Sequence, residues 1–173
     1  MCKNYKKNER MILLIKYLTG EVITTKSDYI AFPANTEGIM GSGLALDIKN
    51  KYPNVWVEYK RKCKDIGTGL FGTYIPINVV DSNLIILACF TQTSASHNSK
   101  TTNLNELKKI FKQLEKTTKE KKTITIPYRY GCGVNNASWN EVHKILYDIF
   151  DKSDVILQIV RKWEWTDEEK VVD

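Results

Sequence analysis

Residues 29–51 read YIAFPANTEGIMGSGLALDIKNK, and this stretch decides the fold. Its apolar opening, residues 29–34, predicts a short buried strand. The glycine-rich segment at residues 35–43 leads into residues 44–51, whose composition is typical of a helix. In sheets that carry helices on their faces, ligands bind in loops of this kind, where a strand ends and a helix begins.

Strand-like and helix-like segments alternate on both sides of this stretch. Further strands are predicted at residues 11–18, 71–80, 84–90, 123–127 and 155–160. Helices are predicted from Pro53, from residue 104 and across the apolar positions between Val142 and Phe150. The alternation indicates an α/β fold with a mainly parallel or mixed sheet and helices on both faces.

Two of the helix starts have the spacing of a capping box. Asn103 stands three residues before Glu106, and Ser138 stands three residues before Glu141. Because serine followed by glutamate matches the motif best, the second box is the stronger prediction.

The bulk composition fits one ordinary domain. The chain has 173 residues, of which 42% are hydrophobic and 27% charged, as in a globular protein with a single core. We predict a loose charged extension at residues 1–10, the domain at residues 11–162, and a polar tail at residues 163–173.

The net charge of +6 favours an anionic partner. Nucleic acid, a phosphorylated small molecule and an acidic surface all satisfy that charge. Solvated ends and loops account for much of the excess, for instance in the lysines of residues 116–122. Basic and aromatic residues do not interleave, so nucleic acid ranks last among these partners.

The four cysteines, Cys2, Cys63, Cys89 and Cys132, are widely and irregularly spaced. Such spacing argues against a zinc site and against a disulfide framework, and it suits reduced thiols. The apolar runs are too short to span a bilayer, and the N-terminus lacks a signal-peptide pattern. We therefore expect a cytoplasmic protein with no membrane segment, metal or cofactor.

The first glycine-rich segment has the character of a phosphate cradle. Gly38, Gly41 and Gly43 allow close backbone approach, and the helix N-terminus that follows attracts anions. The simpler alternative to phosphate binding is a tight turn that needs these glycines for its own backbone geometry. The pattern is neither the Rossmann fingerprint, whose glycine spacing differs, nor a P-loop, which would need a lysine after the last glycine.

A second glycine-containing loop, at residues 128–137, also leaves a strand and enters a helix. Two such cradles in one small sheet predict a diphosphate ligand between them. Cys132 lies in this loop, but the arginine and the base that a cysteine phosphatase needs are absent from its surroundings. We interpret Cys132 as a small packed residue.

Four motifs together resemble the macrodomain family. PANTEGIMGSGLAL at residues 33–46 looks like its asparagine and glycine-rich motif, and IPYRYGCGVNNASW at residues 126–139 looks like its second phosphate loop. LTGEVI at residues 18–23 and SASH at residues 94–97 are similar to two further motifs. The resemblance spans residues 11–160, keeps the motif order, and is strongest to the branch of the ADP-ribose 1''-phosphate phosphatase and the terminal ADP-ribose protein glycohydrolase.

The resemblance implies a three-layer αβα sandwich with a central mixed sheet that binds ADP-ribose or a phosphorylated derivative. Glu21 would meet the adenine amino group, and Asn35 would face the distal ribose. The other ligand-binding residues that it implies are Gly41, Ser42, Gly43 and Leu44 on one side and Gly131, Cys132, Gly133, Val134 and Asn135 on the other.

Two positions depart from the glycohydrolase pattern. Gln92 stands where that enzyme has a lysine, and Asn135 stands where it has an aspartate. Neither side chain can form a Schiff base or exchange a proton in that way. The hypothesis is therefore hydrolysis of ADP-ribose 1''-phosphate, with Asn35 orienting the ribose and His97 as general base.

Two alternatives stay open beside this hypothesis. His97 could instead cap its own polar loop. The whole chain could be a non-catalytic reader or sequestering protein for ADP-ribose-type nucleotides. Of the remaining titratable residues, His143 is expected to be structural, and Asp47 could face either solvent or the ribose.

Overall fold

The computed structural model describes residues 14–95, 102–119, 121–133 and 137–164. Within these ranges six strands form one sheet in the order β1-β6-β5-β2-β4-β3. Neighbouring strands are parallel except for the antiparallel pair β3–β4. The strands are β1 (Ile15–Thr19), β2 (Tyr29–Asn35), β3 (Tyr74–Asn78), β4 (Ile85–Gln92), β5 (Thr123–Pro127) and β6 (Ile156–Arg161).

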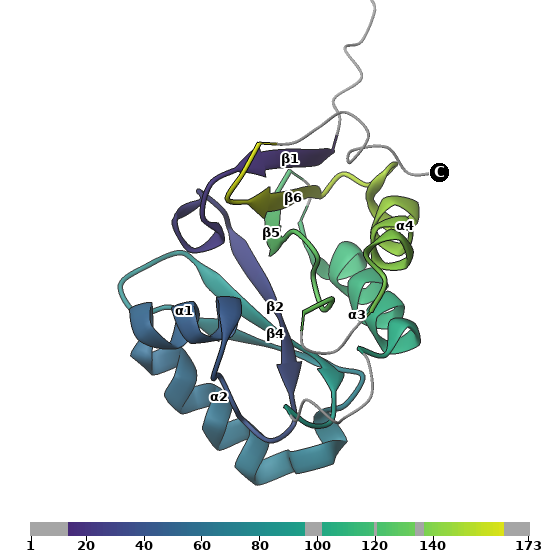
Figure 1. Cartoon of the computed structure of the whole chain (residues 1–173). Coiled ribbons are helices and arrows are strands. Elements are labelled where there is room, and N and C mark those ends of the chain that lie inside the picture. Colours follow the sequence, from purple (N-terminus) through teal and green to yellow (C-terminus); the bar gives the residue numbers. More distant parts are fainter. Residues whose placement is uncertain (1–13, 96–101, 120, 134–136, 165–173) are drawn as a thin grey trace, which may run out of the picture.

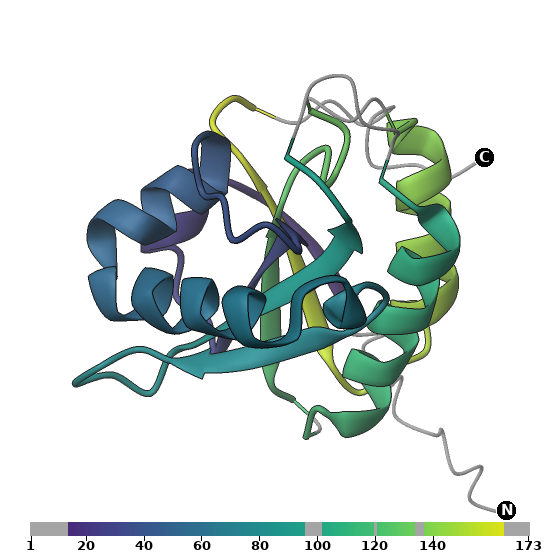
Figure 2. The ribbon, with the colours of Figure 1, turned by 90° about the horizontal axis from the view of Figure 1, so that it is seen from below.

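Helices cover both faces of the sheet. Figures 1 and 2 show α1 and α2 on one face and α3 and α4 on the other. The helices are α1 (Gly43–Lys51), α2 (Pro53–Ile66), α3 (Leu104–Thr117) and α4 (Trp139–Phe150), with short 3-10 turns at η1 (Val22–Thr24) and η2 (Gly67–Leu70). The predicted three-layer α/β sandwich with a mixed sheet is confirmed.

The central strand β2 shows how the sequence pattern makes two cores. Successive side chains of a strand point to opposite faces, so Ala31 joins the cluster under α3 and α4, while Ile30 and Phe32 join the cluster under α1 and α2. All three are at most 1% exposed. A continuous apolar run is typical of such a strand, because both of its faces are covered.

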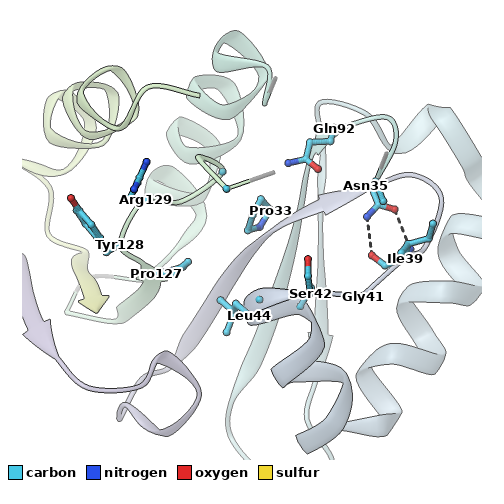
Figure 3. A pocket seen from close by; sticks show the side chains of 15 residues that line it. Pro33, Asn35, Ile39, Gly41, Ser42, Leu44, Gln92, Pro127, Tyr128 and Arg129 are labelled. Atoms are coloured by element: carbon cyan, nitrogen blue, oxygen red, sulfur yellow. Dashed lines mark hydrogen bonds between the residues drawn. The ribbon is translucent and has the colours of Figure 1, made fainter. Parts of the chain in front are cut away.

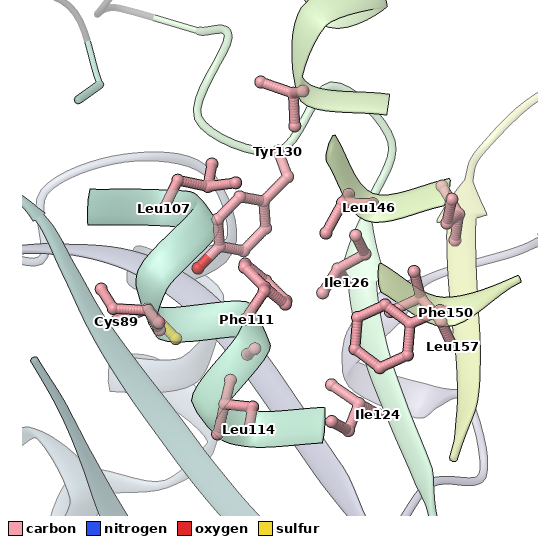
Figure 4. Close-up of a cluster of buried hydrophobic side chains, with 14 of the residues drawn as sticks. Cys89, Leu107, Phe111, Leu114, Ile124, Ile126, Tyr130, Leu146, Phe150 and Leu157 are labelled. Atoms are coloured by element: carbon pink, nitrogen blue, oxygen red, sulfur yellow. The ribbon is translucent and has the colours of Figure 1, made fainter. Parts of the chain in front are cut away.

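The core under α3 and α4 also anchors the segment that follows β5. Phe111 of α3 packs edge-on against Tyr130 and Phe150, with ring centroids 5.3 and 6.3 Å apart (Figure 4). Tyr130 is completely buried. The glycine-rich turn at Gly131 therefore starts from a residue that is fixed in the core.

The helix starts differ from the predicted ranking. The Asn103 side chain accepts hydrogen bonds from the backbone N–H groups of Asn105 (3.0 Å) and Glu106 (3.1 Å) at the start of α3. Ser138 makes no side-chain cap at the start of α4. The weaker of the two predicted boxes is thus the one whose N-cap bond forms.

One predicted strand is shorter than expected. Residues 71–80 were expected to be extended throughout, but β3 covers only Tyr74–Asn78. The turn before it needs Gly72, whose φ of +76° lies in the left-handed region that glycine favours.

In the described part of the chain no helix is long and apolar enough to cross a membrane.

Candidate functional site

The two glycine-rich turns line one cavity at the carboxyl ends of the strands. We call the turn between β2 and α1 loop 1 (residues 36–42) and the described part of the segment after β5 loop 2 (residues 128–133). The cavity has a volume of about 620 Å³ and is open on one side (Figure 3). Its wall consists of Pro33, Asn35, Ile39, Gly41, Ser42, Gly43, Leu44, Ala45, Gln92, Ala95, Pro127, Tyr128, Arg129, Gly131 and Gly133.

Asn35 shapes loop 1 through both ends of its amide. Its Nδ2 donates to the Ile39 carbonyl at 2.8 Å, and its Oδ1 accepts from the Ile39 N–H at 3.1 Å (Figure 3). The side chain thus closes the turn on itself, in the way that asparagine commonly stabilises turns. Asn35 lines the cavity, and it also braces the loop.

Tyr59 of α2 holds the same residue from behind. Its hydroxyl donates to the Asn35 carbonyl at 2.6 Å and accepts from the Asn35 N–H at 3.2 Å. Tyr59 is fully buried, and burial raises the pKa of its phenol, so the hydroxyl keeps its proton and can donate. The Cys63 thiol of α2 donates to the same carbonyl at 3.7 Å, so two side chains of α2 hold Asn35 at the start of loop 1.

Replacing Tyr59 by phenylalanine is expected to lower the free energy of unfolding by about 2–3 kcal/mol, because two buried backbone groups lose a partner. Chemical denaturation measures this change. Tyr74→Phe is the matched control, since its hydroxyl bonds Thr117 at an exposed site, and its expected cost is below about 0.5 kcal/mol. Equal costs for the two variants would show that Tyr59 is not a special anchor.

Loop 2 is tied to its surroundings by a short chain of buried hydrogen bonds. Thr102 donates from Oγ1 to the Gly131 carbonyl at 2.7 Å, and Gln92 donates from Nε2 to Thr102 Oγ1 at 3.2 Å. Gln92 is 8% exposed and lines the cavity. The end of β4, the entry to α3 and loop 2 are thereby linked.

Cys132 does not line this cavity, although it was among the predicted ligand-binding residues. Its side chain is buried, and its N–H donates to the Arg129 carbonyl at 2.9 Å. Burial raises the pKa of the thiol to about 11, so the sulfur is protonated and unreactive near neutral pH. The interpretation of Cys132 as a packed residue fits this environment.

The start of α1 faces the cavity. Gly41, Ser42 and Gly43 are exposed and line it, and the first turn of α1 contains no acidic residue. The first N–H groups of a helix lack intrahelical acceptors and carry partial positive charge. This part of the wall therefore favours an anion.

Arg129 adds a full charge to the same cavity. Among the described residues of the wall, it is the only side chain that is charged at neutral pH. Its φ of +57° is unusual for a residue with a side chain. The described wall residues include no carboxylate, imidazole or lysine, although the Glu37 carboxylate accepts from the N–H of the wall residue Ala95 at 2.9 Å. Arg129 therefore gives the wall itself a positive charge.

A second, smaller cavity of about 250 Å³ continues from the first. The two share Gly43, Leu44, Pro127 and Tyr128. Its other walls are formed by the first turn after β1 and by the end of β6, and its lining includes Glu21, Asp47, Arg161, Lys162 and Trp163. Together the two cavities form one elongated site.

A cluster of one arginine and two aromatic rings, Arg161, Tyr128 and Trp163, forms one wall of the second cavity. The Arg161 guanidinium lies 5.3 Å from the ring centroids of both Tyr128 and Trp163. Arg161 is 4% exposed, and its Nε donates to the Trp163 carbonyl at 2.9 Å. The Tyr128 and Trp163 rings meet edge to face at 89°, with centroids 6.0 Å apart, so this wall offers aromatic surface on which a planar ring can pack.

Glu21 is placed at the second cavity, with a partner that the sequence did not reveal. Its carboxylate lies 3.0 Å from the Lys162 ammonium in an exposed ion pair. Exposed pairs of this kind are weak. A ligand that offers a hydrogen-bond donor can therefore compete for the Glu21 oxygens at little cost.

The structure brings together most of the predicted site residues. Asn35 and the predicted residues of loop 1 and α1 share one cavity with Gly131 and Gly133, and Glu21 lies at its extension. His97, Val134 and Asn135 lie outside the described residues.

His143 has the surroundings of a structural histidine. It is buried and bonds the Tyr17 hydroxyl through Nε2 at 2.7 Å, and burial lowers its pKa.

Sequence reasoning missed the residues that complete the walls. Tyr128 and Arg129 stand inside the quoted second motif, but nothing in their spacing marked them as lining residues. Arg161 is the final residue of the last strand and Trp163 follows it, where the alternation of elements has ended. Among the described residues no group of three histidine, cysteine or acidic side chains could hold a metal ion.

Comparison with known proteins agrees with this architecture. A family model of the macro domain matches residues 31–146. The chain is 30% identical over 116 residues to the ADP-ribose 1''-phosphate phosphatase of Saccharomyces cerevisiae, which covers 64% of this chain and 65% of that protein. It is 31% identical over 51 residues to the DNA ADP-ribosyl glycohydrolase of Mycobacterium tuberculosis, covering 30% of this chain and 14% of that protein.

Solved structures show the same fold. The macrodomain of Mycobacterium tuberculosis DarG superposes with a TM-score of 0.72 at 22% identity, covering 84% of this chain and 96% of that one. Thermosipho africanus DarTG in complex with ADP-ribose gives a TM-score of 0.77 at 18% identity, covering 93% of this chain and 45% of that one. Because the family model matches more than half of this chain, the chain belongs to the macro domain family.

Proposed function

We propose that this protein binds the ADP-ribose unit, with the diphosphate held between loop 1 and loop 2. The observation that carries the proposal is one cavity lined by both glycine-rich turns, a helix N-terminus and a single cationic side chain, Arg129. Backbone N–H groups and one arginine are the groups that proteins use for phosphate recognition. The Thermosipho africanus complex with ADP-ribose has this fold and supports the choice of ligand.

The second cavity suits the nucleobase. Tyr128 and Trp163 offer aromatic surface, and Glu21 offers an acceptor for an exocyclic amino group. The distal ribose then lies toward Asn35 and Gln92 at the other end of the site. This orientation uses the full length of the two connected cavities.

We further propose that the ligand is ADP-ribose 1''-phosphate and that the chain hydrolyses it. Water would attack the terminal phosphorus, the bond from phosphorus to the ribose oxygen would break, and inorganic phosphate and ADP-ribose would leave. His97 would accept the proton of the water and return it to the ribose oxygen that leaves phosphorus. The similarity to the yeast ADP-ribose 1''-phosphate phosphatase supports this reaction.

A non-catalytic reader is the second candidate, and a specific observation favours it. The described wall contains no carboxylate, imidazole or lysine, and Gln92 is held by Thr102 rather than poised for proton transfer. Such a site would retain ADP-ribose without cleaving it. The two candidates share the binding step and differ only in turnover.

Calorimetry and phosphate release separate the candidates. We expect binding of ADP-ribose, and release of phosphate from ADP-ribose 1''-phosphate that falls at least 100-fold in His97→Ala, about the lower end of the usual effect of losing a general base. ADP-ribose affinity should stay within about threefold in the same variant. Tight binding without release by the unaltered protein would establish the reader instead, and no binding of either nucleotide would refute both.

A further inference from the structure

A row of lysines follows the solvent side of α3. Lys108, Lys112 and Lys116, here called the lysine row, are exposed and four residues apart, which places neighbours about 6 Å apart along the helix axis. With Asn105, Lys109 and Gln113 they surround a shallow groove of about 460 Å³. The groove lies outside the nucleotide site described above.

The lysine row faces directly away from the core. With about 100° of rotation per residue, its three members lie within about 80° of one another. Leu107, Ile110 and Leu114, which are at most 2% exposed, occupy the opposite side of α3. The row therefore makes no contribution to packing, and its side chains are available to a partner.

The charge of the row is not neutralised by any ion pair among the described residues. The nearest acidic residues of α3 lie on its flanks: Glu106 pairs with Lys109 at 3.3 Å, and Glu115 accepts from Ser153 at 2.9 Å. Like charges four residues apart on a helix repel, so a bound polyanion would relieve that repulsion.

We propose that the lysine row binds the phosphodiester backbone of a nucleic acid. One strand of duplex DNA carries a phosphate about every 3.4 Å along the axis, so lysines about 6 Å apart can meet alternate phosphates of one strand. Contacts to the backbone alone give binding without sequence preference. In the sequence, nucleic acid ranks last because basic and aromatic residues do not interleave. That criterion does not take account of lysines four residues apart, which share one face of a helix.

The row also begins close to the nucleotide site. Thr102, two residues before α3, donates to the Gly131 carbonyl of loop 2 at 2.7 Å. The N-terminal end of α3 is therefore connected to loop 2, one wall of the first cavity. The surface goes beyond the proposed ADP-ribose pocket, and its binding of DNA does not require that pocket to be occupied.

The test is binding of a fluorescent 20-base-pair DNA duplex between 50 and 200 mM salt, measured by anisotropy. Replacing Lys108, Lys112 and Lys116 by glutamine should reduce the magnitude of the slope of log affinity against log salt by about 2.7, at about 0.9 per phosphate contact. The affinity at 100 mM salt should fall at least tenfold. Glutamine keeps helix propensity, and thermal unfolding confirms that the variant is folded.

The matched control removes the same charge elsewhere. Lys64, Lys144 and Lys152 are exposed, and their replacement by glutamine should change the slope by less than about 1. ADP-ribose affinity, measured by calorimetry, should be unchanged in both triple variants, so failure of the DNA surface and failure of the nucleotide pocket are distinguishable. Equal losses in both triple variants, no duplex binding at 50 mM salt, or binding to vesicles of anionic lipid without binding to DNA would each overturn the proposal.

Discussion

Replacing Gly41 by glutamate is expected to abolish ADP-ribose binding in a protein that stays folded. Gly41 lines the first cavity, and a Cβ at this position would meet nothing closer than the Ile39 Cγ2 at 3.8 Å. The new carboxylate would share the cavity with a diphosphate, and two like charges about 4 Å apart repel by about 4 kcal/mol near a protein surface. We expect a loss of at least 100-fold in calorimetry, which corresponds to about 2.8 kcal/mol.

Gly41→Gln is the control for this experiment, because it has the same size and no charge. It should bind ADP-ribose at least tenfold better than Gly41→Glu. Gly41→Ala should remain close to the unaltered protein, since the space beside Gly41 is open. Undiminished affinity in Gly41→Glu would show that loop 1 does not hold the diphosphate.

Replacing Gly131 by alanine is expected to damage both the fold and the site. Gly131 has a φ of +71°, and a Cβ there would lie 2.8 Å from Thr102 Oγ1 and 3.0 Å from Thr102 Cγ2. The left-handed conformation alone costs about 1–2 kcal/mol for a residue with a side chain. The contact also displaces Thr102 from its hydrogen bond to loop 2, so we expect a total loss of about 2–4 kcal/mol in unfolding free energy.

ADP-ribose affinity should fall at least tenfold in the same variant, because loop 2 loses its anchor. Gly133→Ala is the matched control for stability: a Cβ at Gly133 meets no atom within 4 Å. Its unfolding free energy should change by less than about 0.5 kcal/mol. If Gly131→Ala is as stable as this control, the chain of bonds through Thr102 does not constrain loop 2.

Local patterns in the sequence were sufficient to predict the layers and the two loops. Strand β2 and helix α1 could be predicted because an apolar run, a glycine-rich turn and a helical segment follow one another without interruption. The convergence of loop 1 and loop 2 could be predicted because the carboxyl ends of parallel strands meet at one edge of a sheet. The cavity that both loops line is consistent with that reasoning.

The residues that the sequence did not reveal depend on contacts between distant segments. Arg161 becomes part of the site through its contacts with Tyr128 and Trp163, two rings that also contact each other. Likewise, Tyr59 has the helical spacing of an ordinary core residue. It holds loop 1 only because its hydroxyl, on α2, bonds the backbone of Asn35 at the end of β2. The cap at Asn103 forms and that at Ser138 does not, although both residues have an extended backbone, so the difference lies in the side chains and not in the backbone.

Arg129 illustrates a conflict between stability and recognition within one residue. Its left-handed backbone costs free energy that glycine at the same position would recover, yet glycine would remove the one formal charge on the described wall of the first cavity. Selection for heat resistance alone would favour glycine or asparagine at position 129. An arginine in this conformation is what we expect of a chain selected for holding phosphate at the expense of part of its own robustness.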